Sequence, residues 1–226
     1  MSSTNVTPMP NARSRVTAAT RNATSSLQKE EPAPSTDASS PRARLLATAR
    51  RLFYQEGPRA VGIDRVLSES GVAKMSLYRH FDSKDALITA CLEEHEKEYW
   101  TLWDDAVSAM GTDPVKKLQS VIRFIANRTS NPRYQGCVFL NTVQSFPDES
   151  HPAHQAAVRH KQALASRLHK LCGDAKAKKS RILAQQLLLL INGAQATAGM
   201  LGKETQMSLI GAANELLRAQ GISLSR

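Results

Sequence analysis

Apolar residues recur every three or four positions along the chain after Pro41, which is the spacing of one helical face. In the first such stretch, the recurring residues are Leu45, Leu46, Ala49, Leu52 and Phe53. No segment alternates apolar with polar residues as a half-buried strand does, and there is no internal repeat. The pattern therefore predicts an all-α fold of about nine helices.

Glycine, proline and capping residues indicate where these helices begin and end. The first helix should end at Gly57-Pro58, because a C-cap glycine followed by proline cannot continue it. We expect two short helices next, over about 62–69 and 74–81, joined by a turn that contains Gly71. A Ser or Asp N-cap within residues 82–85 then begins a long helix that reaches about Ala109.

The later helices follow the same logic. Asp113-Pro114 has the order of an N-cap and a first-turn proline, and that helix should end near Asn131-Pro132. Short apolar segments follow around 137–146. The remaining helices are expected from His151-Pro152 to about Cys172, from 178 to 200, and from 204 to 219.

The chain is basic, and its positive charge is denser near the N-terminal helices. Its 226 residues carry a net charge of +10. Residues 41–90 hold nine Lys/Arg and five Asp/Glu, whereas the much longer stretch 91–226 holds seventeen and twelve. Such a balance favours nucleic acid, an anionic membrane or an acidic ligand as a partner. The longest apolar run, 187–191, is too short to span a bilayer, so no membrane role is expected.

Residues 1–40 differ from the rest in composition. They are rich in Ser, Thr, Ala and Pro, and cannot bury enough apolar surface to offset the entropy of ordering them. We interpret them as a disordered tail. A transit peptide or a basic arm that touches DNA phosphates would have a similar composition, because the early charges Arg13, Arg15 and Arg21 are all basic.

Cysteine and histidine patterns give no sign of a metal, a cofactor or a catalytic centre. Three widely spaced cysteines without a CxxC pair suggest reduced thiols and a cytoplasmic protein. Cys137 could sense oxidants, but a small buried hydrophobic residue is the favoured interpretation. The histidines at 151, 154, 160 and 169 lack a completing ligand set. There is also no nucleophile–base pair and no phosphate loop, so an enzyme is not expected.

The stretch "GVAKMSLYRHF", residues 71–81, puts an unusual set of side chains on a short helix. On a wheel with Leu77 pointing inward, Phe81 lies about 40° away and also faces the core. The outward strip consists of Met75, Ser76, Tyr78 and Arg79, with Lys74 at the start of the helix and His80 nearer the edge of the core.

An outward strip of this kind suits the major groove of DNA. An Arg and short polar side chains can reach base edges, while Lys and Tyr can hold the flanking phosphates. The preceding helix and the turn glycine complete a helix-turn-helix over residues 62–81. The alternative is a solvated face on an ordinary helical hairpin, which the clustered charge disfavours.

The segment "RLLATARRLFYQEGPRAVGIDRVLSESGVAKMSLYRHFDSKDAL", residues 44–87, resembles the DNA-binding domain of TetR-family transcriptional regulators. The matching positions include Gly57, Gly71, Tyr78, Phe81 and Lys84. Two later segments, 136–164 and 183–198, are similar to the C-terminal half of one branch of that family. The resemblance implies a DNA-binding domain over 41–99 and a ligand-binding and dimerisation domain over 100–226.

The resemblance also implies a mechanism and a set of DNA contacts. Family members are homodimeric repressors that leave an inverted-repeat operator when a small molecule binds and the long fourth helix, here about 83–109, moves. The DNA contacts implied or inferred are Gly62, Lys74, Met75, Ser76, Tyr78, Arg79, His80 and Lys84.

Four positions depart from the family pattern, and one of them is Ala73, where the family often has Ser. Val61 and Gly62 stand where a Ser or Thr usually caps the second helix and contacts a phosphate. Met75 stands where the family often has glycine, and it could touch a thymine methyl group. These changes bear on the operator sequence more than on DNA binding itself.

The C-terminal half supplies two further expectations. Aromatic residues gathered after the DNA-binding domain suggest a pocket for an apolar or aromatic effector, lined by Trp100, Trp103, Phe124, Cys137 and Phe139. Helices near the end resemble the pair that forms a four-helix bundle across a dimer, with interface residues Leu187, Leu188, Ile191, Leu209, Ala213 and Leu216. The alternatives are a plain helical core and burial within one chain. For the protein as a whole, the alternatives are a non-specific structural DNA binder and an enzyme acting on a small hydrophobic substrate.

Overall fold

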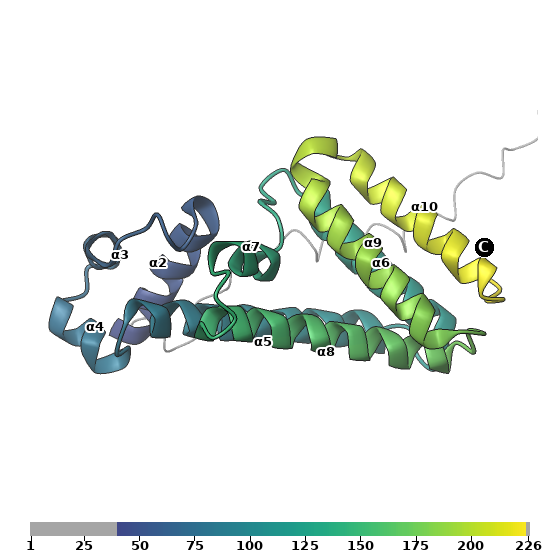
Figure 1. The fold of residues 1–226 in the computed structure, drawn as a ribbon, viewed down its shortest axis with the longest axis horizontal. Helices are drawn as coiled ribbons and strands as arrows, with labels where there is room; N and C mark the ends of the chain where they lie inside the picture. The colour runs from purple at the N-terminus through teal and green to yellow at the C-terminus, as the bar shows by residue number, and fades with distance from the viewer. Residues whose placement is uncertain (1–39, 225–226) are drawn as a thin grey trace, which may run out of the picture. The chain divides into compact units, whose positions relative to one another are not determined.

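The computed structural model describes residues 40–224, and within them it contains helices and no strand (Figure 1). The helices are α2 (Pro41–Glu56), α3 (Ile63–Ser70), α4 (Lys74–His80), α5 (Lys84–Ser108), α6 (Pro114–Thr129), α7 (Val138–Ser145), α8 (Pro152–Asp174), α9 (Ser180–Leu201) and α10 (Glu204–Ala219). The prediction of an all-α fold is confirmed. The predicted tail lies outside the described residues, apart from Ser40.

Side-chain caps begin several helices at the predicted places. The Ser40 hydroxyl accepts the Ala43 N–H at 3.2 Å, and the Ser83 hydroxyl accepts the Ala86 N–H at 3.0 Å. Asp113 Oδ1 accepts two backbone N–H groups, at 2.9 and 3.1 Å, beside the first-turn proline of α6. Each such cap satisfies N–H groups that have no partner within the helix, and contributes about 1 kcal/mol.

Helices α2, α3 and α4 pack around a small core of their own. The residues that fill it include Leu45, Leu52, Val66, Leu77 and Phe81, each at most 4% exposed. This cluster continues without a break onto the first turns of α5, through Leu87 and Ile88, and onto α7. The three N-terminal helices are therefore anchored to the start of α5.

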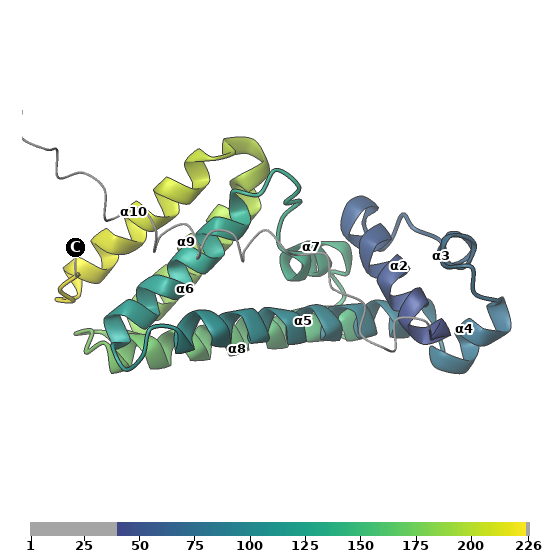
Figure 2. The same cartoon turned by 180° about the vertical axis from the view of Figure 1, so that it is seen from behind.

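The second half of α5 belongs to a different apolar cluster. Tyr99 and Trp103 pack there with α6, α8, α9 and α10, whereas Ile88 and Leu92 pack with α2–α4. Helices α5 and α8 run side by side in both views, while α6, α9 and α10 form an oblique group above them (Figures 1 and 2). Helix α5 runs without a break through residues 99 and 100, where the sequence predicted the boundary between the two domains. That boundary stays a prediction.

A helix that crosses a bilayer must be both long and apolar. No helix within residues 40–224 combines the length and apolar character that crossing a membrane requires.

Candidate nucleic-acid interface

The turn between α3 and α4 depends on a glycine in the left-handed region. Gly71 has φ +62° and ψ +31°, and its N–H donates to the Leu67 carbonyl at 3.0 Å. A residue with a side chain adopts this conformation at a cost of about 1–2 kcal/mol. Gly71 thus ends α3 and turns the chain toward α4, as the sequence predicted.

Arg44 of α2 holds the same turn from the other side. Its guanidinium donates to the Ser70 carbonyl, from Nε at 3.1 Å, and to the Gly71 carbonyl, from Nη2 at 2.9 Å. These carbonyls end α3, so the positive charge also lies at the negative end of that helix. A Cβ on Gly71 would come within 2.7 Å of Arg44 Nη2. Sequence reasoning missed Arg44, because its partners lie 26 and 27 residues away.

Helix α4 presents the predicted strip to solvent. Leu77 is fully buried, whereas Met75 is 79% exposed and Tyr78 is 45% exposed. Lys74, Arg79 and His80 are exposed, and Ser76 is partly exposed. His80 therefore faces outward rather than toward the edge of the core. The chain presents five potential base or phosphate contacts and one methionine on a single short helix.

Lys84 and Gly62 lie at the flanks of α4. The Lys84 ammonium reaches the Arg59 carbonyl at 3.5 Å, and partial burial lowers the pKa of this lysine. Gly62 is the N-cap of α3 and has no side chain to satisfy the first N–H groups of that helix. Those N–H groups are left for water or an anion.

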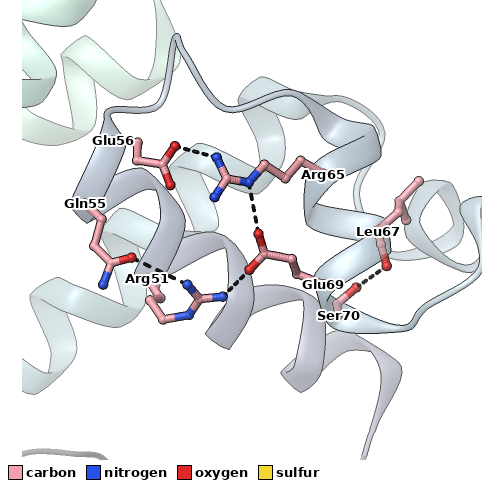
Figure 3. Close-up of polar contacts among 7 residues, drawn as sticks. All are labelled: Arg51, Gln55, Glu56, Arg65, Leu67, Glu69 and Ser70. Carbon is pink, nitrogen blue, oxygen red and sulfur yellow. Dashed lines mark hydrogen bonds and ion pairs between the residues drawn. The ribbon is translucent and has the colours of Figure 1, made fainter.

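An ion-pair network joins α2 to α3 (Figure 3). Glu69 bridges Arg51 and Arg65, and Arg65 also reaches Glu56. The two hydrogen bonds that Glu69 accepts from Arg51 and Arg65 lower its pKa, and the hydrogen bonds that Arg65 donates to Glu56 and Glu69 raise the pKa of Arg65. The network is exposed, so salt screens it. It adds exposed polar contacts between α2 and α3, the helix that leads into the turn before α4.

Residues 45–91 match the sequence model of the family described as "Bacterial regulatory proteins, tetR family". The fold extends the match well beyond these residues. A crystal structure of a TetR-family transcriptional regulator from Streptomyces coelicolor superposes with a TM-score of 0.77 at 32% identity, over 80% of this chain and 95% of that one.

The chain belongs to the TetR family of transcriptional regulators.

Two more comparisons agree with this TetR-family assignment. A structure from Streptomyces avermitilis aligns over 81% of this chain and all of that one, at 30% identity and a TM-score of 0.72. The transcriptional regulator YjdC of Escherichia coli is 24% identical over 150 residues, which is 66% of this chain and 78% of YjdC. The protein is thus a DNA-binding transcriptional regulator with a helix-turn-helix, and it is not an enzyme.

The residues predicted to line an effector pocket lie in the interior of this TetR-family protein. Trp103, Phe124, Cys137 and Phe139 are buried, and Trp100 is half-buried. Phe139 stacks on His160, with ring centroids 3.6 Å apart. None of the five residues lines the cavity of about 260 Å³ that lies between α2, α5 and α7.

Glu96 organises the polar part of this interior. Its Oε1 accepts the Trp100 indole N–H at 3.1 Å and lies 3.2 Å from His160 Nδ1. Burial lowers the pKa of His160 to about 3, so the imidazole is neutral and Nδ1 carries the hydrogen that it donates. These contacts fix Trp100 and His160 within the packed interior.

The residues predicted to form a dimer interface divide into two groups. Leu187, Ile191, Leu209 and Ala213 are at most 1% exposed and pack inside the chain's own core, so they are not available to a partner. Leu188 and Leu216 are partly exposed. The exposed large apolar side chains of α9 and α10 are Ile182, Leu189, Met200, Leu201 and Met207.

The three cysteines and two of the histidines, His151 and His154, lie in buried or hydrogen-bonded positions. All three cysteines are free and buried, and burial raises the pKa of Cys91 and of Cys172 to about 12. His151 caps α8, and His154 reaches the Phe146 carbonyl at 2.7 Å. Within residues 40–224, no group of three or more His, Cys, Asp or Glu is placed to hold a metal ion.

Proposed function

We propose that the protein is a homodimeric repressor that binds an inverted-repeat operator and leaves it when a small molecule binds. The observation that carries the proposal is the outward face of α4. It consists of cationic, hydroxyl and apolar side chains, and the Arg44 contacts and the α2–α3 ion pairs hold it in place. A face of this kind fits the major groove.

The residues of this face have two roles, contact with bases and contact with phosphates. Arg79 and Met75 read bases, through guanine acceptors and a thymine methyl group respectively. Lys74, Ser76, Tyr78 and His80 hold phosphates and set the register of the helix on the duplex. Lys84 adds a further phosphate contact, and so do the free N–H groups of α3 beside Gly62.

Dimerisation uses the outward stripe of α9. Ile182, Leu189 and Met200 are separated by seven and eleven residues, which returns each to the same side of the helix. Gly193 lies on this side and is exposed, so a partner helix can approach closely. Met207 of α10 adds a further exposed apolar side chain. A two-fold dimer places its recognition helices on two symmetric half-sites.

Release of the operator follows from the position of α5. This helix belongs to both apolar clusters, so a shift of α5 by a bound effector is transmitted to α2–α4. The two recognition helices of a dimer then no longer match the half-site spacing. We place the protein in the cytoplasm, where it would meet the chromosome.

Selection from fragmented genomic DNA tests the proposal. Purified protein is incubated with the fragments in about 0.15 M salt, and the retained DNA is sequenced. We expect enrichment of a small number of fragments that share one inverted repeat. A non-specific structural DNA binder would retain fragments without a shared sequence, and that result would exclude the operator-binding proposal.

A further inference from the structure

A cavity of about 260 Å³ opens where the DNA-binding helices meet the rest of the protein. Its walls come from α2, from the first turns of α5 and from α7, and the segment before α7 contributes Gln135. It is smaller than the roughly 300–1,000 Å³ of pockets that hold drug-sized ligands. A ligand that fills it is correspondingly small.

The inner wall of the cavity is apolar. Phe53 comes from α2, Ile88 and Leu92 come from α5, and each is at most 8% exposed. Val138 of α7 adds a further apolar side chain. An apolar or aromatic body is therefore the favoured occupant of this end of the cavity.

The α7 wall offers two hydroxyl acceptors whose own hydrogens are already used. The Thr142 hydroxyl donates to the Val138 carbonyl at 2.8 Å, and the Ser145 hydroxyl donates to the Asn141 carbonyl at 2.8 Å. Asn141 Nδ2 donates to the Gln135 carbonyl at 3.2 Å. The Thr142 and Ser145 hydroxyl oxygens have used their hydrogens and retain lone pairs, so they match a ligand that donates. The Asn141 amide keeps its oxygen as an acceptor and a second N–H as a donor.

The charge in the cavity wall is balanced. Arg50 forms a two-point ion pair with Glu98, and its Nη1 lies 2.7 Å from Glu98 Oε1. No other ionisable side chain besides Tyr54 and Cys91 lines the cavity among the described residues, and burial raises the pKa of both. A charged ligand would lose its hydration without gaining an unpaired counter-charge.

We propose that this cavity binds the effector, and that the effector is a small, neutral, largely apolar molecule carrying an N–H or O–H donor. The inference rests on the proposed function, because it gives a site and a chemical class to the effector of a ligand-released repressor. The site differs from the interior around Trp103 and Phe124, which the sequence had favoured.

Tyr54 connects the cavity to the DNA-binding helices. Its hydroxyl, on α2, accepts the Gln135 N–H at 2.9 Å and donates to the Gly136 carbonyl at 3.3 Å. This pair of bonds ties α2 directly to the segment that leads into α7. A ligand bound between α2 and α7 therefore displaces α2 directly, and this displacement adds to any movement of α5.

Indole is the probe for the binding step, and 1-methylindole is its matched control, since it keeps the ring system and lacks the donor. Amide NMR spectra of the full chain are recorded with each compound at up to about 1 mM, a range that detects affinities near −4 kcal/mol. We expect saturable shifts at residues 138–145 with indole, and at least tenfold weaker binding of 1-methylindole. Equal binding of the two compounds, or no saturable shift with indole, phenol or benzamide, would overturn the proposal.

Substitution of Ser145 locates the site. Ser145→Trp fills the cavity and should abolish indole binding. If the tryptophan disturbs folding, Ser145→Leu is used instead; it fills the cavity partly and should weaken binding. Ser166→Trp is the matched control, because Ser166 is an exposed α8 serine that does not line the cavity. Indole binding that survives Ser145→Trp in a folded protein would place the ligand elsewhere and contradict the inference.

A last variant separates this inference from the proposed function. Tyr54→Phe keeps the ring and removes the hydroxyl that ties α2 to the segment before α7. The reduction in operator affinity that saturating indole causes should therefore fall by at least half in this variant. Affinity for the operator without indole tests the repressor itself, and the NMR titration needs no DNA. Loss of operator binding alone would therefore count against the function, and loss of indole binding alone against the cavity.

Discussion

Gly71 and Arg44 hold the turn between α3 and α4 in two ways that differ in their range along the chain. Gly71 acts through its own backbone conformation, which a local pattern of residues can predict. Arg44 acts through the carbonyls of Ser70 and Gly71, which approach it only when α2 packs on α3. At the scale of single residues, the sequence predicted the first and not the second.

Replacement of Arg44 tests whether the guanidinium positions the turn. Arg44→Ala removes the charge-assisted hydrogen bonds to the end of α3, so the free energy of unfolding should fall by about 1–2 kcal/mol and operator affinity should fall with it. Arg44→Lys should recover little, because an ammonium lacks the planar fork that spans two carbonyls. Urea unfolding and DNA binding of both variants provide the measurement. Full recovery by Lys would show that the charge alone is sufficient.

Helix boundaries were largely predictable from the chain, because caps and breakers act over a few residues. Ser83 and Asp113 cap α5 and α6 as expected, and Gly57 ends α2. The segment around 137–146 appeared only as short apolar stretches, and it forms α7. It packs on α8, which follows it in the chain, and it meets α2 and α5, which are distant in sequence, around the cavity. The cavity that α2, α5 and α7 enclose could not be predicted for the same reason.

The exposed network between α2 and α3 gives a prediction at the scale of elements. Glu69→Gln removes the carboxylate that bridges Arg51 and Arg65, so the melting temperature should fall at low ionic strength and the difference should shrink in high salt. The bridge lowers the pKa of Glu69, so its contribution exists above the pKa that this group has when unfolded. It is lost as the pH falls through the folded value.

Thermal melting at two salt concentrations and a series of pH values checks this prediction. Glu93→Gln, at an exposed position of α5, is the control for the loss of one carboxylate. A Glu69→Gln effect that is the same at all salt concentrations would indicate packing rather than electrostatics.

The assembly of the whole molecule depends on which side of α9 its own core covers. The run from Leu187 to Ile191 is apolar on every side, so the sequence alone did not distinguish the buried face from the outward one. The structure turns Leu187 and Ile191 inward and Leu189 outward. A pattern that is apolar all round leaves this choice to tertiary packing.

Leu189→Glu tests the dimer at its proposed centre. Leu189 is 72% exposed in the single chain, so the substitution should leave the fold intact while burying a carboxylate in the dimer. We expect light scattering after size exclusion to give the mass of two chains for wild type and of one chain for the variant. Thr101→Glu, at an exposed position of α5, should remain dimeric. A monomeric wild type, or a dimeric Leu189→Glu protein, would argue against the α9 interface.

Binding to the DNA upstream of the protein's own gene, measured by fluorescence anisotropy against a scrambled duplex across a salt series, tests operator recognition by α4. We predict much tighter binding to the native fragment at about 0.15 M salt, and a loss of about 1–3 kcal/mol of this discrimination in Arg79→Ala. Arg181→Ala, which removes an exposed cation from α9, should keep the discrimination. Equal affinity of wild type for both duplexes, with the same salt slope, would contradict specific recognition of this DNA by the helix-turn-helix.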